Sequence, residues 1–227
     1  MKKSLFIIVN FLMIVCNYAQ TIQIGIGGGS TIVTGKEFYT KEFNNGFLYE
    51  DRFELNAVDG LNFNSEYNLN LKARLFFPNN PFIIYSEVSY NSLIGEGMVR
   101  KVYSDPPMPY IPPLQKSESK SNLVNVSLGI EYEFFNKSIT PFLSSGIVLS
   151  YLGDINVETM DNNYEGKIME GGIRYGFEIG LGVYYNFYDN FLIGISSQYS
   201  MNNLIGKKEA EENINTVKTN INILYEL

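Results

Sequence analysis

Eight charged residues recur at alternate positions within amphipathic segments of this 227-residue chain. Four are cationic and four are anionic: Lys72, Arg74, Arg174 and Lys218, against Glu87, Glu131, Glu133 and Glu178. In each segment they share one face with Gly, Ser and Asn, whereas the opposite face is apolar. An enclosed set of charges must approach neutrality, so this balance predicts ion pairs that line a narrow interior, or lumen. The alternative is a solvated sheet face on which the pairing is accidental.

The composition leaves little room for catalysis. The chain has no His, so neither a Ser-His-Asp nor a Cys-His arrangement can form. If its single Cys, Cys16, is removed with a signal peptide, no thiol remains to act as a nucleophile or metal ligand. The acidic clusters Glu50-Asp51 and Glu209–Glu212 lack the ligand spacing of a calcium-binding loop. We therefore predict no enzymatic activity, no cofactor, and no catalytic or metal-binding residue.

Two glycine-rich stretches resemble nucleotide-binding loops only in part. The run Gly25–Ser30 follows a candidate strand, but no helical pattern follows it, as a dinucleotide-binding motif requires. The segment Thr34-Gly35-Lys36 has Ser30 where a phosphate-binding loop needs its first Gly, and Glu37 where it needs Ser or Thr. Both stretches are interpreted as barrel positions or the rim of a loop. The formal charge of −7 predicts no nucleic-acid partner, because clustered Lys and Arg are needed to neutralise phosphates.

The segment that best shows how such charges are positioned is Ile173–Phe187. Its odd positions are all large and apolar, and its even positions are Arg174, Glu178, three Gly, Tyr184 and Asn186. A period of two is that of a β-strand. Soluble strands average about 5 to 6 residues, whereas a tilted strand that crosses a bilayer needs about 9 to 11. The segment is therefore typical of a membrane barrel.

The same period predicts seven more strands and an uneven set of connections. The other candidate strands are 21–33, 66–77, 82–92, 122–135, 140–152, 191–201 and 214–227. Three connections are tight turns, at 78–81, 136–139 and 188–190. Four are long loops, at 34–65, 93–121, 153–172 and 202–213. Alternation of short turns and long loops is typical of a bacterial outer-membrane barrel.

The N-terminus has the layout of a secretory signal peptide. Lys2 and Lys3 precede an apolar stretch that ends at Cys16, and the small residue Ala19 is the expected cleavage point. We expect residues 1–19 to be the signal peptide and residues 20–227 to be one outer-membrane β-barrel domain. Cys16 suggests lipoprotein processing as a rival interpretation, but Val15 is not the small residue that such processing favours.

With these features together, the chain resembles the small eight-stranded outer-membrane barrels of the OmpA and OmpX type. The resemblance covers residues 20–227 and implies an all-β, eight-stranded antiparallel up-and-down transmembrane β-barrel. It also implies contact with outer-membrane lipid, both termini in the periplasm, and recognition of the C-terminal strand by the barrel-assembly machinery. That strand ends in Leu227, where the family usually has Phe. The expected aromatic girdle comprises Phe82, Tyr185, Phe187, Phe191 and Tyr225.

Turn lengths predict strand registers. If Asn79-Asn80 is a two-residue loop, Lys72 lies directly opposite Glu87, and an opposite-charge pair there would stabilise the hairpin. A three-residue loop at 188–190 would pair Phe187 with Phe191, Tyr184 with Gly194, and Gly180 with Gln198.

The expected function is that of a non-enzymatic anchor whose long loops meet an extracellular or envelope protein. The loops carry the distinctive features: five prolines in Asp105–Pro113, and a cluster of aromatic residues in Phe38–Phe53 that extends the hairpins or plugs the mouth. Two alternatives remain open, a narrow transport pore and a soluble, lipocalin-like periplasmic lipid carrier.

Overall fold

The structure is a computed structural model, and it describes residues 21–34, 54–78, 80–102, 115–134, 138–159, 165–207 and 213–227. Several predicted features lie outside the described residues. They are the signal peptide, the aromatic cluster of Phe38–Phe53, the prolines of Asp105–Pro113, and the acidic clusters Glu50-Asp51 and Glu209–Glu212. Within the described ranges, no helix is long and apolar enough to span a membrane.

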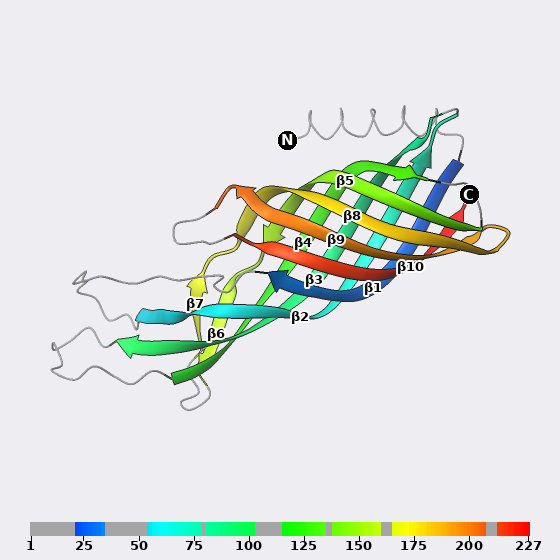
Figure 1. Ribbon diagram of the computed structural model, residues 1–227. Helices are drawn as coiled ribbons and strands as arrows, with labels where there is room; N and C mark the ends of the chain where they lie inside the picture. The colour runs from blue at the N-terminus through cyan, green and yellow to red at the C-terminus, as the bar shows by residue number, and fades with distance from the viewer. Residues whose placement is uncertain are drawn as a thin grey trace.

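All of the regular structure in these described ranges is antiparallel β-sheet. The strands are β1 (Thr21–Thr34), β2 (Glu54–Phe76), β3 (Phe82–Val102), β4 (Gln115–Glu133), β5 (Ile139–Leu152), β6 (Ile155–Thr159), β7 (Glu165–Met169), β8 (Gly172–Tyr188), β9 (Phe191–Ile205) and β10 (Asn215–Glu226). Eight of them pair in the cycle β1-β2-β3-β4-β5-β8-β9-β10, and β10 pairs with β1. This closed cycle (Figure 1) confirms the predicted eight-stranded up-and-down barrel.

Alternation of side chains explains why these segments form a closed wall. In β5 nearly every second residue is buried, and the residues between them are exposed or half-buried. The same holds for β10 and for most of the other strands. Closure leaves every strand with two hydrogen-bonded neighbours over the length of the barrel, so no strand edge is left open there.

One end of the barrel, here called the turn end, carries the three short turns. Asn80 N donates to Phe77 O (3.3 Å), and Phe134 N donates to Pro141 O (3.0 Å). The described chain ends lie at the same end, because Leu227 N donates to Ile22 O (2.9 Å). Figure 1 shows β1 starting and β10 finishing beside these turns.

At the opposite loop end, four strands run clearly further than predicted. The expected loops 34–65, 93–121 and 202–213 are wrong in their bounds, because β2 begins at Glu54, β3 continues to Val102, β4 begins at Gln115 and β9 continues to Ile205. The pairing Glu54↔Val102 joins β2 to β3 at the far end of this extension. Hydrophobic alternation fades where neither face of a sheet must be apolar, whereas backbone pairing continues, so the pattern underestimated the strands.

The expected loop 153–172 contains a hairpin that the pattern missed. β6 and β7 pair with each other, and β6 pairs with β4 through Glu118↔Glu158, beyond the point where β5 ends. The extended parts of β2, β3 and β4 therefore continue, with β6 and β7, as a sheet beyond the barrel rim (Figure 1).

Candidate functional site

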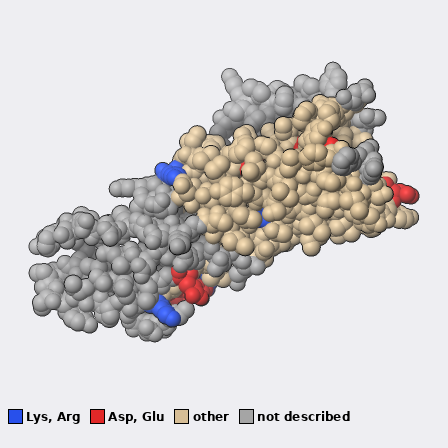
Figure 2. Space-filling view, viewed as in Figure 1, with Lys and Arg blue, Asp and Glu red and all other residues tan. Residues whose placement is uncertain are grey.

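The outer surface of the barrel is apolar. On β8 the outward residues Ile179 and Leu181 are 51% and 60% exposed, whereas their inward neighbour Glu178 is 1% exposed. Large apolar side chains occupy outward positions on the other barrel strands too, such as Ile26 on β1 and Leu128 on β4. Figure 2 shows one face of this wall, on which Lys, Arg, Asp and Glu gather mainly towards the ends. The outer surface is therefore unlike that of a protein solvated by water.

Aromatic side chains form a cluster on the outside near the turn end. The rings of Phe191 and Tyr225 lie 5.0 Å apart, and those of Phe187 and Phe191 lie 6.1 Å apart. The ring centroids of Phe82 and Tyr132 lie 5.5 Å apart, and Tyr185 is 49% exposed on the same outer surface. The five expected girdle residues thus all lie at outward positions close to the short turns.

The eight predicted charges point the other way, into the lumen. Seven of them are at most 2% exposed, and Glu133, near the turn end, is 22% exposed. Their inward placement follows from the strand period, because each shares the buried face with the Gly, Ser and Asn residues of its strand. We predict that these eight charges stabilise the barrel, which unfolding measurements can test.

The first ion-pair cluster lies near the turn end and joins β2 to β4. Glu131 accepts a hydrogen bond from Lys72 Nζ and another from Arg74 Nε (2.7 Å). The Arg74 guanidinium also donates to Glu133 and to Gln23, which in turn donates to Glu226 (2.9 Å). These contacts cross the lumen and pair every charge in the cluster, as burial requires.

Two aromatic rings cover this first cluster. The Tyr184 hydroxyl accepts a hydrogen bond from Lys72 Nζ (3.0 Å), and its ring lies 4.0 Å from the Arg74 guanidinium carbon. The Tyr184 ring also stacks on Phe142 at 4.5 Å. Because rings attract a cation over their faces, they add to the stabilisation that the carboxylates supply.

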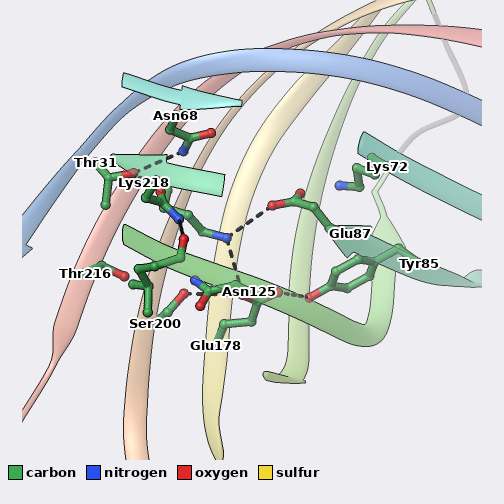
Figure 3. A network of polar contacts seen from close by, with 12 residues as sticks. Thr31, Asn68, Lys72, Tyr85, Glu87, Asn125, Glu178, Ser200, Thr216 and Lys218 are labelled. Carbon is green, nitrogen blue, oxygen red and sulfur yellow. Dashed lines mark hydrogen bonds and ion pairs between the residues drawn. The ribbon is translucent and has the colours of Figure 1, made fainter. Parts of the chain in front are cut away.

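The second cluster lies further towards the loop end and is shown in Figure 3. Lys218 Nζ lies 3.1 Å from Glu87 Oε1 and 3.7 Å from Glu178 Oε2. Glu178 also accepts hydrogen bonds from Tyr85 Oη (2.8 Å) and Ser200 Oγ (3.3 Å). One ammonium group therefore sits between two buried carboxylates, and a tyrosine and a serine complete the coordination of Glu178.

The predicted pairing of Lys72 with Glu87 is right in register and wrong as an ion pair. The two residues are direct neighbours across β2 and β3. The ammonium group of Lys72 nevertheless binds Glu131 on β4, and Glu87 binds Lys218 on β10. A long side chain inside a narrow closed barrel can reach across the lumen, so the nearest strand does not determine its partner.

Of the three pairings predicted for the hairpin at 188–190, two are confirmed and one is wrong. Tyr184 pairs with Gly194, and a Cβ placed on Gly194 would lie 2.7 Å from the Tyr184 ring. Gly180 pairs with Gln198, whereas a bulge makes Tyr188 rather than Phe187 the partner of Phe191. Arg174 is fully buried on β8 opposite Ser150, nearer the loop end than either cluster.

Several interior residues were not singled out from the sequence. Gln23 and Tyr85 belong to the networks, and their inward positions in β1 and β3 were the available signal. Towards the loop end the interior holds apolar side chains, such as Leu93, Leu123 and Leu152, and polar ones, such as Asn91 and Asn202, all at most 1% exposed. At the turn end Phe142, Tyr184 and Leu224 form an apolar layer. Buried side chains therefore line the described lumen from the turn end to the loop end.

The described residues contain no group of three or more His, Cys, Asp and Glu that could hold a metal ion. The acidic residues of the lumen are instead arranged around Lys and Arg, as the two clusters show. The chemical role that this arrangement of ion pairs supports is structural: it joins strands of the barrel wall across the lumen.

No protein-family model and no curated protein matches the chain. Among solved structures, it is similar to Neisserial surface protein A, with 10% identity and a TM-score of 0.49, over 90% of this chain and 95% of that one. It is similar to OprG from Pseudomonas aeruginosa, with 12% identity and a TM-score of 0.49, over 92% and 97%. It is also similar to Ail of Yersinia pestis, solved with the heparin analogue sucrose octasulfate, with 13% identity and a TM-score of 0.46, over 91% and 97%.

Proposed function

We infer that this chain is an integral outer-membrane β-barrel that serves as a non-enzymatic structural anchor. The observation that carries this inference is the inversion of the usual polarity of a soluble protein. Large apolar side chains cover the outside, and the charges lie inside. Within the described wall, no Lys, Arg, Asp or Glu occupies an outward position between Tyr175 and Tyr185 of β8 or in the matching stretches of the other strands.

The height of this apolar band supports a bilayer location. Tyr175 and Tyr185 are both outward and exposed, and the outward residues between them on β8 are all apolar. Ten residues of strand extend about 33 Å, and a tilt of about 35–45° reduces this to a height of about 25 Å. The apolar band of outer-membrane barrels is about 25 Å tall and is flanked by aromatic residues at both interfaces.

The orientation and biogenesis are part of the same proposal. Residues 1–19 would direct export, and β10 would be recognised by the barrel-assembly machinery although it is followed by Leu227. The turn end, with both termini of the barrel, would face the periplasm. The connections of the loop end would then face outwards, where they are the surface available to an extracellular or envelope protein.

Heat-modifiable migration tests fold and location together. Outer membranes would be isolated from cells that express the full chain, and the protein would be compared on gels before and after boiling. A folded barrel resists detergent at room temperature, so we expect two different mobilities for the outer-membrane fraction. Recovery of the protein in the aqueous fraction after lysis without detergent would instead favour the soluble lipid carrier.

The described interior disfavours both alternatives. A lipid carrier needs an apolar cavity, but the lumen holds Lys72, Glu131 and Lys218 in direct ion pairs. A pore needs an open path, but the apolar layer of Phe142, Tyr184 and Leu224 and the first ion-pair cluster lie across the described lumen at the turn end.

A further inference from the structure

The outer wall of the barrel is hollowed by a groove with a volume of about 520 Å³. Its lining residues come from β3, β4, β5, β8, β9 and β10, which are consecutive strands of the wall. The volume lies within the range of about 300–1,000 Å³ that is typical of small-molecule sites.

Two small outward residues lie in this groove among larger ones. Ser145 on β5 is in register with Ile130 on β4 and with Ile179 on β8. Ser197 on β9 is in register with Leu181 on β8. Both serines are half-buried, whereas the three larger side chains are exposed. A short side chain between longer ones leaves a hollow, so the sequence itself forms the groove.

The groove extends from the aromatic cluster near the turn end to the middle of the wall. Phe82 and Tyr132 line one part of it, and Ile179, midway along β8, lines another. Tyr185 of the aromatic girdle lies six residues from Ile179 on β8. Six residues of tilted strand span a height of about 15 Å, which is about half of a hydrocarbon core of about 30 Å. The groove therefore covers the depth of one leaflet.

The lining has the chemistry of a hydrocarbon site. Apolar and aromatic side chains predominate, and no described residue that lines the groove is Lys, Arg, Asp or Glu. A charged group would have no counter-charge here, whereas a neutral alkyl chain matches the lining. The groove is also continuous with the apolar wall that is assigned above to the bilayer.

A second copy of the chain fits the groove less well. A symmetric dimer uses the same surface patch on both subunits, so it would set one groove against the other. Two facing hollows enclose a void, and the atoms that line a void lose their packing contacts. A long and flexible alkyl chain can instead follow the groove and fill it.

We propose that this groove binds one acyl chain of a phospholipid from the periplasmic leaflet. The proposal rests on the proposed function, which places the turn end towards the periplasm. The glycerol backbone of the lipid lies at the level of Phe82 and Tyr132. Its acyl chain passes over Ser145 and Ser197 and reaches the depth of Ile179.

Native mass spectrometry of the full-length barrel, released from isolated outer membranes in a non-ionic detergent, tests the proposal. The mass of the bound molecule separates a phospholipid from lipopolysaccharide, from detergent and from a second copy of the chain. We expect one phospholipid on most barrels. Wild-type barrels that carry only detergent, only lipopolysaccharide or a second copy would overturn the proposal.

Filling the groove tests its place on the wall. Ser145→Leu combined with Ser197→Leu puts larger apolar side chains in the hollow and should lower the phospholipid-bound fraction about tenfold, because contacts with methylene groups are lost. Ser86→Leu is the matched control, since Ser86 is also an outward and half-buried serine but does not line the groove. It should leave the bound fraction unchanged. Equal phospholipid on the wild type and both variants would show lipid bound elsewhere and contradict the proposal.

Heat-modifiable migration separates failure of this proposal from failure of the membrane location. Recovery of the wild-type protein in the aqueous fraction would overturn both. A heat-modifiable barrel that is found in the outer membrane without a bound phospholipid would overturn the lipid groove alone.

Discussion

Lys72 and Glu87 are direct neighbours across β2 and β3, yet each forms its ion pair with a different strand. Lys72 reaches Glu131 on β4, and Glu87 reaches Lys218 on β10. The lumen therefore holds two clusters of ion pairs, and each joins strands that are not neighbours in the wall.

A double-mutant cycle should show this choice of partner. Removing one partner of a buried ion pair typically costs about 3 to 5 kcal/mol, so we expect Lys72→Ala to lower the free energy of unfolding by about that amount. Urea titration of the barrel folded in lipid vesicles measures it. The losses of unfolding free energy from Lys72→Ala and Glu131→Gln should be non-additive, because both substitutions break the same contact, Lys72–Glu131.

The control for that cycle is the sequence neighbour. Lys72→Ala combined with Glu87→Gln should show a smaller coupling energy than Lys72→Ala combined with Glu131→Gln, because Lys72 and Glu87 are cross-strand neighbours whose ion pairs are formed with other residues. Strong coupling between Lys72 and Glu87, with none between Lys72 and Glu131, would show that the hairpin pair predicted from the register governs stability.

The second cluster predicts a sharper contrast between buried and exposed lysines. Lys218→Met leaves Glu87 and Glu178 buried without their shared cation, so we expect a loss of about 3 to 5 kcal/mol in urea unfolding. Lys120, 61% exposed, pairs with Glu118 on β4 near the loop end, and Lys120→Met should change stability by at most about 1 kcal/mol. Equal effects of the two substitutions would mean that the Lys218 site is hydrated.

Depth along the outer wall should control the effect of an outward charge. Ile179, midway along β8, and Phe187, at its turn end, are both outward and about equally exposed, at 51% and 45%. In a bilayer, Ile179→Arg should cost about 2 to 4 kcal/mol and Phe187→Arg about 0 to 1. Unfolding in lipid vesicles compares them. A soluble barrel would tolerate both, so equal small effects would contradict the membrane location.

The wall could be predicted from the sequence because one period of two determines which residues lie inside. Lys72 and Glu178 could be placed in the lumen on this basis alone. Their partners could not be predicted, because the reach of Lys72 to Glu131 depends on the curvature of the closed barrel. The β6–β7 hairpin and the extensions of β2, β3 and β4 lie beyond the apolar band, where no alternation marks a strand. The period of two also places Tyr85 and Tyr184 on the inner face, but their hydrogen bonds to Glu178 and Lys72 depend on three-dimensional packing.

Packing of Tyr184 against a glycine predicts a strong effect from one methyl group. A Cβ on Gly194 would lie 2.7 Å from the Tyr184 ring, which is held between Phe142 and Arg74 and cannot move freely. Overpacking of this kind costs about 1 to 3 kcal/mol, so Gly194→Ala should lower the urea midpoint. In a Tyr184→Leu background the same substitution should cost much less. An unchanged penalty there would assign it to the backbone of β9 instead.

The same packing predicts that the barrel does not conduct ions. Since side chains fill the described lumen of this eight-stranded barrel, we expect no sustained channel openings from the purified protein in a planar lipid bilayer. The apolar layer of Phe142, Tyr184 and Leu224 and the first ion-pair cluster together close the turn end. Replacing Phe142 and Tyr184 by Ala would remove two rings and leave the cations Lys72 and Arg74 beside open space. If these rings seal the lumen, brief openings should appear only in that double variant. Sustained openings of the unaltered barrel would instead establish the transport pore and overturn the assignment as an anchor.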